Sequence, residues 1–265
     1  MKRLTKKEKL NISSMIKEGV SLNEISRITQ RNKSTLYHYY KKISNKRLKD
    51  VEINKDNQMF IGELLGLFVG DGYCFHDKKG GHYSTRFFFN NSEKGYVNQI
   101  IKLFHENFNK KPALNRSLNV LVVRYYSKKL FNFLLNNTKW EVSRNKLGYI
   151  KKSRTISLRN KKFSKDFKKG FLRGFLDSDG YLSNKKVVFS SASELIIKQT
   201  NQFLNDLSFE EHRLSFYKDK RPNRVGMWHL YIPKKEHLKL FRLVQPRNLI
   251  SWNKDMHQPG LEFSN

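Results

Sequence analysis

One pattern occurs twice in this chain, as Leu64-Leu65-Gly66-Leu67-Phe68-Val69-Gly70-Asp71-Gly72 and as Leu172-Arg173-Gly174-Phe175-Leu176-Asp177-Ser178-Asp179-Gly180. Each stretch is an apolar run with helical spacing, carries small residues four positions apart, and ends in Asp-Gly followed by Tyr. Small residues at positions i and i+4 allow two helix backbones to approach closely, a rule best attested in membranes and applied here by analogy. The pattern therefore predicts two helices, one in each half of the chain, that pack against each other.

Asp71 and Asp179 stand in the last turn of these predicted helices. An acid at that position faces the negative end of the helix dipole, at a cost of roughly 0.3–1 kcal/mol, and two such acids repel each other when the helices pack. Both copies place an acid at this unfavourable end of the helix, and a local preference that is violated twice in the same way indicates a functional site. Carboxylates together with substrate phosphates are the usual environment of Mg²⁺. We expect Gly72 and Gly180 to adopt the left-handed conformation that often follows a helix.

Both stretches resemble the motif of the LAGLIDADG homing endonucleases, and one copy in each half is similar to the single-chain, two-repeat form of that family. The resemblance covers about residues 60–256. It implies an α+β fold with two pseudo-symmetric repeats of order α-β-β-α-β-β-α. Their antiparallel sheets would form a saddle over the DNA major groove, with the motif helices at the interface. The implied activity is site-specific, metal-dependent hydrolysis of both strands of a long duplex DNA target.

The resemblance also implies site residues. It places metal ligands at Gly70, Asp71, Ser178 and Asp179, with Mg²⁺ as the ion, Mn²⁺ as a substitute, and Ca²⁺ supporting binding without cleavage. Asp71 and Asp179 would be catalytic, together with Lys254 in the second half and Lys152, with Lys151 close behind, in the first. The sixth motif position is Val69 in one copy and Asp177 in the other. Asp177 could support the site from behind the metal ligands or be an exposed helix residue, and we favour the exposed position.

The composition favours a polyanionic partner. The 265 residues include 53 Lys and Arg against 23 Asp and Glu, a formal net charge of +30, which a nucleic acid would neutralise. A single cysteine, Cys74, excludes an internal disulfide and a cysteine zinc site, and we interpret it as a small core residue. An anionic membrane is the second candidate partner, but we find no apolar run of about 18 residues and no signal peptide, so we expect no membrane partner. We expect an intracellular monomer with access to double-stranded DNA.

Residues 1–45 predict a small all-α domain. The first helix carries Ile12, Met15 and Ile16 and is closed by Gly19, and the second is capped by Ser21 and carries Leu22, Ile25 and Ile28. A third helix opens at Asn32 or Ser34 and has Leu36, Tyr39, Tyr40 and Ile43 for its apolar side. Three short helices with a glycine-containing turn are typical of a helix-turn-helix. The segment resembles the resolvase-type helix-turn-helix family. The residues that would face the major groove are Lys33, Ser34, Thr35, Tyr37 and His38.

Residues 46–59 are polar and indicate a linker. The first repeat is expected over residues 60–138, with strands at 83–89 and 120–126 and helices that follow Ser92 and span 129–135. The second repeat, over residues 170–265, has strands at 186–189, 213–218 and 225–232 and helices that follow Ser193 and span 235–243. This matching order indicates an internal duplication. Residues 139–169 between the repeats indicate a basic, partly ordered linker that lies along phosphates.

Several basic residues of the strands and linkers are candidates for DNA contact, because arginine can pair bidentately with guanine. They are Arg86, Arg124, Lys151, Arg154, Lys185, Arg213, Lys218 and Arg224.

Two other functions use the same scaffold: a DNA-binding regulator that has lost cleavage, and an RNA maturase that assists intron splicing. Loss of cleavage should relax both acid positions, yet Asp71 and Asp179 are intact. Charge does not separate DNA from RNA as the partner. An intein is not expected, because the chain begins with Met1 and ends in Phe263-Ser264-Asn265, without the residues that protein splicing needs.

Overall fold

The computed structural model divides the chain into two compact units, residues 1–49 and residues 50–265. It describes residues 4–43, 50–78, 80–141, 152–183, 186–219 and 225–248. Within these ranges, no helix has the length and apolar character needed to cross a membrane.

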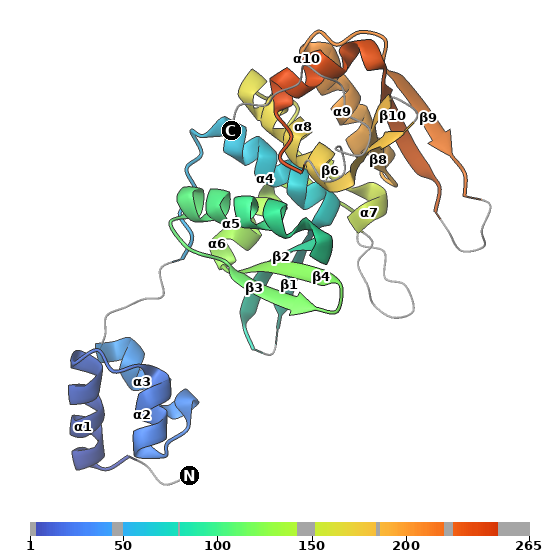
Figure 1. Ribbon diagram of the computed structural model, residues 1–265. Coiled ribbons are helices and arrows are strands. Elements are labelled where there is room, and N and C mark those ends of the chain that lie inside the picture. The colour runs from blue at the N-terminus through green and yellow to red at the C-terminus, as the bar shows by residue number, and fades with distance from the viewer. Residues whose placement is uncertain are drawn as a thin grey trace. The chain divides into compact units, whose positions relative to one another are not determined.

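The first unit contains the predicted helices α1 (Lys6–Lys17), α2 (Leu22–Thr29) and α3 (Lys33–Ile43) (Figure 1). Gly19 has φ of 83°, which allows the chain to turn after α1. The Ser21 hydroxyl caps α2 by accepting from the Glu24 N–H. Ile12, Ile25 and Leu36, one from each helix, are fully buried in the small core. The arrangement confirms the three-helix prediction.

The second unit repeats one order of elements twice, as the duplication predicts. The first repeat contains α4 (Gln58–Asp71), β1 (Gly72–Asp77), β2 (His82–Asn90), α5 (Lys94–Phe108), β3 (Ala113–Ser117), β4 (Val120–Tyr126) and α6 (Lys128–Asn137). The second contains α8 (Lys165–Asp179), β7 (Gly180–Ser183), β8 (Lys186–Ser191), α9 (Glu194–Asp206), β9 (Arg213–Tyr217), β10 (Met227–Ile232) and α10 (Lys234–Val244).

Each repeat has one four-stranded antiparallel sheet, with strand order β1-β2-β4-β3 in the first and β7-β8-β10-β9 in the second. Helices α5 and α6 contact strands of the first sheet, and α9 and α10 contact strands of the second. We call the other face of each sheet its open face. Figure 1 shows the two sheets on either side of the α4–α8 pair.

The motif helices α4 and α8 meet backbone to backbone, as the small residues predict. A Cβ atom added to Gly66 would lie 2.6 Å from the Phe175 nitrogen, and one added to Gly174 would lie 2.8 Å from the Leu67 nitrogen. Gly62 and Gly170, one turn earlier, are equally close to the opposite helix. The close contact therefore spans three turns of each helix.

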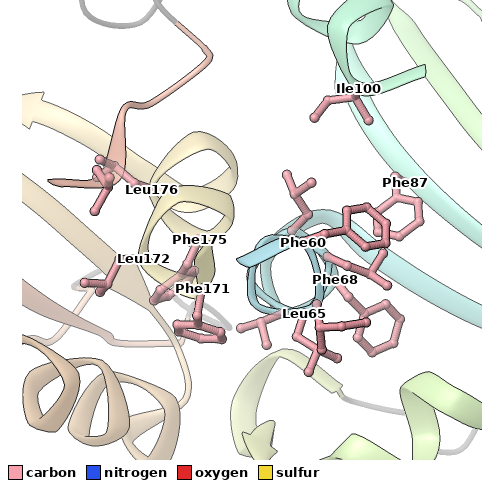
Figure 2. Close-up of a cluster of buried hydrophobic side chains, with 14 of the residues drawn as sticks. Phe60, Leu65, Phe68, Phe87, Ile100, Phe171, Leu172, Phe175 and Leu176 are labelled. Atoms are coloured by element: carbon pink, nitrogen blue, oxygen red, sulfur yellow. The ribbon is translucent and has the colours of Figure 1, made fainter. Parts of the chain in front are cut away.

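Apolar side chains surround this helix pair. In Figure 2, Phe60 and Phe68 extend from α4 toward Phe87 of the first sheet, whereas Leu172 and Leu176 extend from α8 away from α4. All five are buried within one continuous core. The two acids at the helix ends thus stand on a rigid support.

Two expected boundaries differ from the structure. Val51 lies in the predicted linker 46–59, but it is buried in the core of the second unit, and the Glu52 N–H donates to the Phe108 carbonyl. The predicted linker 139–169 contains β5 (Thr138–Lys139) paired with β6 (Ser157–Leu158), the short helix α7 (Lys152–Thr155), and the start of α8 at Lys165. Apolar residues such as Ile156, which is buried, tie these segments to the second unit.

The expected left-handed glycines are a further correction. Gly72 has φ −84° and ψ 149°, and Gly180 has φ −89° and ψ 154°, so each helix passes directly into an extended strand. A side chain at either position would collide with the preceding helical turn, at Phe68 or Leu176. Glycine is therefore required at both positions because a larger side chain would not fit, and not because the backbone is left-handed there.

Candidate active site and nucleic-acid interface

Asp71 and Asp179 are the last residues of α4 and α8. The helices are so close there that a Cβ atom added to Gly70 would lie 2.7 Å from the Ser178 Cβ and 3.1 Å from the Asp179 Oδ2. The Ser178 hydroxyl donates to carbonyls of its own helix, those of Gly174 and Phe175. The small residues at this position therefore bring the two acids together.

The surroundings of these acids disfavour their charged forms. Burial, together with the charges of Asp179 and Glu93, raises the pKa of Asp71 to about 8, against the opposing effect of Lys152. Burial also raises the pKa of Asp179 to about 6, and Lys152 again opposes the shift. Two carboxylates that resist ionisation in this way are suited to a cation that would stabilise both charges.

Lys152, from the short helix α7, reaches the carboxyl end of α4. Its Nζ donates to the carbonyls of Phe68 at 2.5 Å, Val69 at 3.0 Å and Gly72 at 2.6 Å, and it lies 3.5 Å from the Gly70 oxygen. Val69 and Gly70 belong to the last turn of α4, where carbonyls lack a donor within the helix and a cation satisfies them well, whereas Phe68 O also accepts from the Gly72 N–H. Burial lowers the pKa of Lys152 to about 8, although both site acids favour its charged form.

The protein groups fit a divalent cation only with help from the substrate. Within the described ranges, no three His, Cys, Asp or Glu side chains gather into a metal-binding cluster. Asp71 and Asp179 supply two carboxylates, and Mg²⁺ is commonly held by one or two carboxylates together with phosphates and water. The donor set therefore suits a metal that binds together with a phosphodiester.

Glu93 is a site residue that sequence reasoning missed. It ends the short 3-10 turn Asn91–Glu93 after β2, where its carboxylate accepts from the Asn90 N–H at 2.7 Å. Its charge is among the causes that raise the pKa of Asp71, so it contributes to the electrostatics of the acid pair. The spacing of Asn90 and Glu93 is that of a capping box, which was the available signal.

The open face of the first sheet carries both arginines predicted for it. Arg86 and Arg124 are directly paired across β2 and β4. Their neighbours along the strands, Phe87 and Val123, are buried on the opposite, helix-covered face. Because successive side chains of a strand point to opposite faces, both arginines belong to the face that a major groove could approach.

The second sheet places Arg213 on its open face, in the row of Tyr181, Val188 and Tyr231. Lys218 follows the end of β9 and is exposed, as is Arg154 of α7. In the first unit, Lys33, Ser34, Tyr37 and His38 are exposed on α3 and Thr35 is half-buried. These residues are all accessible, which the prediction of DNA contact requires.

Comparisons with known proteins agree with this architecture. Residues 166–243 match the family model of a LAGLIDADG-like domain. A structure of mesophilic variants of the homing endonuclease I-DmoI superposes with a TM-score of 0.51 at 18% sequence identity, covering 72% of this chain and 98% of that one. The described residues between 50 and 248 have the two-repeat LAGLIDADG fold.

I-DmoI in complex with DNA and Ca gives a TM-score of 0.51 at 18% identity, with 72% of this chain and 91% of that chain covered. I-DmoI in complex with DNA and Mn gives 0.50 at 19% identity, with coverages of 71% and 96%. No curated protein sequence matches the chain. At these identities the likeness establishes the fold.

One residue of the second LAGLIDADG motif is not where we expected it. Asp177 is buried, and its carboxylate accepts from the N–H groups of Arg247 and Asn248 at 3.0–3.1 Å. The Asn248 amide in turn donates to Glu93 Oε1 at 2.6 Å and to the Asp177 carbonyl at 3.2 Å. Asp177 therefore holds the chain after α10 against the motif helices, a role that its sequence neighbours do not reveal.

Four predicted site residues lie outside the described residues: Lys151, Lys185, Arg224 and Lys254. Cys74 is partly buried beside the first LAGLIDADG motif, with its Sγ 3.8 Å from the Thr85 Oγ1. Burial raises the pKa of this thiol to about 11, which keeps it protonated and agrees with a structural role.

Proposed function

We propose that this protein is a site-specific endonuclease that hydrolyses both strands of a long duplex DNA target with a divalent metal. The observation that carries the proposal is the convergence of Asp71 and Asp179 at the ends of α4 and α8. Each acid stands beside a sheet whose open face carries arginine. A single chain thus provides both halves of the site, which supports a monomeric enzyme.

Each group has a definite role in this proposal. Asp71 and Asp179 would hold the metal together with substrate phosphates, and a bound metal would supply an activated water and stabilise the charge that develops on the phosphate. Lys152, anchored on carbonyls of Phe68 and Val69 in α4 and of Gly72 just past its end, adds positive charge at a fixed place. Arg86, Arg124 and Arg213 bind and orient the duplex.

The metal is proposed to be Mg²⁺, with Mn²⁺ as a substitute and Ca²⁺ as a cation that permits binding without cleavage. I-DmoI has been crystallised with DNA and Ca and with DNA and Mn, which supports divalent metals in general. The three-helix unit is proposed to add a second DNA contact through α3.

The test begins with selection of bound sequences from randomised duplex DNA in Ca²⁺, followed by addition of Mg²⁺ to the recovered duplexes. Wild type is compared with Asp71→Asn and Asp179→Asn. Asp77→Asn is the matched control, because Asp77 is an acid of the same half at the end of β1. We expect wild type and Asp77→Asn to cut both strands at one site, and the two motif variants to bind without cutting.

Two other outcomes would contradict the proposal and point elsewhere. A specific duplex that wild type binds but never cuts would make the protein a regulator. If no duplex is enriched, the partner is to be sought in structured RNA, as for a splicing maturase.

A further inference from the structure

The open face of the first sheet carries exposed aromatic rings beside its arginines. Phe75 is 41% exposed and Phe88 is 37% exposed, and neither ring has a polar atom. Tyr73 and Tyr126 are also exposed on this face. Such a surface is costly to leave in water, so it indicates a partner with apolar groups of its own.

Strand register arranges these side chains in rows. Phe75 is opposite Ser84, which is opposite Tyr126. The next row pairs Tyr73, Arg86 and Arg124, and the row after it pairs Phe88 with Val122. Side chains on one face of a strand recur at about 6.8 Å, which is about the rise of two base pairs of B-DNA. An arginine row thus lies between two rows with apolar rings.

The two arginines are held in place before any DNA binds. The Arg86 guanidinium lies 5.5 Å from the centroid of the Phe75 ring, and its Nε donates to the Ser84 hydroxyl at 3.1 Å. The Arg124 guanidinium lies 5.7 Å from the Tyr126 ring and donates to its hydroxyl at 2.9 Å. Groups ordered in advance lose less entropy on binding. Arginine in the major groove pairs best with guanine.

The second sheet differs in the chemistry of its open face. Its rings there are Tyr181, Tyr217, His229 and Tyr231, and each of them carries a polar atom. The Tyr181 hydroxyl lies 3.4 Å from His229 Nδ1. The two halves of the saddle are therefore suited to different base sequences.

We infer that the first sheet recognises thymine methyl groups on both sides of a guanine, with Phe75 and Phe88 as the residues that contact the methyls. Thymine presents a C5-methyl in the major groove, and phenylalanine is an apolar partner for it. Arg86 and Arg124, in the row between the two phenylalanines, are the groups that would pair with the guanine. The inference rests on the proposed function, since it names the character of one half of the DNA target.

The experiment uses the full chain and the duplex selected in Ca²⁺. Deoxyuridine replaces thymidine in one half-site at a time, which removes only the C5-methyl and leaves each hydrogen-bonding atom in place. In the half-site bound by the first sheet, we expect affinity to fall about fourfold for each contacted thymine, the effect of one buried methyl group. In the other half-site we expect a change of less than twofold.

Phe88→Ala and Phe75→Ala should remove this difference between thymine and uracil in the same half-site. Leu114→Ala is the matched control, because Leu114 is an exposed apolar residue of the same sheet whose register places it on the opposite face. It should retain the full effect of the methyl group. A duplex that is bound and cut but does not respond to uracil overturns this inference alone, as does a uracil effect that the two phenylalanine variants retain. Failure to select any duplex overturns the proposed function with it.

Discussion

Glu63 of α4 and Arg173 of α8 form a buried ion pair across the interface of the motif helices, with 3.1 Å between Oε2 and Nη1. Arg247, which follows α10, adds a second contact, with its Nε 2.6 Å from Glu63 Oε1. Arg173 also donates to the Val244 carbonyl at 2.5 Å. One carboxylate thus joins both motif helices to the end of the second repeat.

Glu63→Ala should destabilise the protein by about 3–5 kcal/mol, because it leaves the Arg173 guanidinium buried without its anion. Equilibrium unfolding in urea measures this loss. The double variant Glu63→Leu with Arg173→Leu removes both charges of the pair. Its loss of stability should be smaller than the sum of the losses measured for Glu63→Leu and Arg173→Leu alone. Additive losses would show that the pair is not coupled.

The glycines of the helix interface give a second stability prediction. Gly66→Ala should cost several kcal/mol, because the new methyl group would collide with the backbone at Phe171 and Phe175. Gly95 is the control: it lies in α5 with open space around its Cα, so Gly95→Ala should stabilise by about 0.4–1 kcal/mol. Thermal unfolding should give a lower melting temperature for Gly66→Ala and a higher one for Gly95→Ala than for wild type. A small change for Gly66→Ala would mean that α4 and α8 can move apart to accommodate the methyl group.

The fold was predictable where the residue preferences of a segment agree with the structure that it adopts. Strands β2 and β4 are rich in aromatic and β-branched residues, and the helix caps at Ser21 and Ser127 follow known preferences. β1 and β7 were not recognised as separate strands, because each continues directly from a motif helix through a glycine. β3 was also missed, since every one of its residues is exposed.

The candidate site was predictable only in part, for a similar reason. Asp71 and Asp179 break a local rule and are visible in the sequence. The burial of Asp177 depends on N–H groups of Arg247 and Asn248, which are distant in the chain. The cap formed by Lys152 depends on α4, also far away in sequence. The spacing of apolar residues along the chain predicts helices and strands but not contacts between residues that are distant in sequence.

Metal binding should release protons near neutral pH. The pKa values of Asp71, about 8, and Asp179, about 6, mean that protons occupy part of this pair at pH 7, whereas a metal requires the ionised carboxylates. Affinity for Ca²⁺ should therefore rise with pH across this window. The measurement is calorimetry at pH 7 in which Ca²⁺ is added to the protein in the presence of its selected duplex, in two buffers of different ionisation enthalpy, where the observed heats should differ. Asp71→Asn should reduce this difference, and equal heats in both buffers for wild type would contradict the prediction.

Lys152→Met should impair both stability and cleavage. The variant keeps most of the side-chain volume but takes the Lys152 donor away from the carbonyls of Val69, in the last turn of α4, and Gly72, just past its end, at a cost of about 1–3 kcal/mol. Arg154→Met is the control, because Arg154 is exposed on the same short helix. Lys152→Met should have a lower free energy of unfolding in urea and a slower single-turnover cleavage rate than Arg154→Met. Loss of cleavage at unchanged stability would show that the cap does not hold α4.

Removal of residues 1–49 should weaken DNA binding without changing the chemical step. The deletion ends before Val51, because Val51 belongs to the core of the second unit. The deleted unit carries 14 Lys and Arg against 3 Glu, and each lost phosphate contact should reduce the salt slope of binding by about 0.9. Single-turnover cleavage at saturating protein should remain close to that of the full chain, since Asp71, Asp179 and Lys152 are retained. A shortened protein that binds with the original slope but does not cut would place the first unit in catalysis.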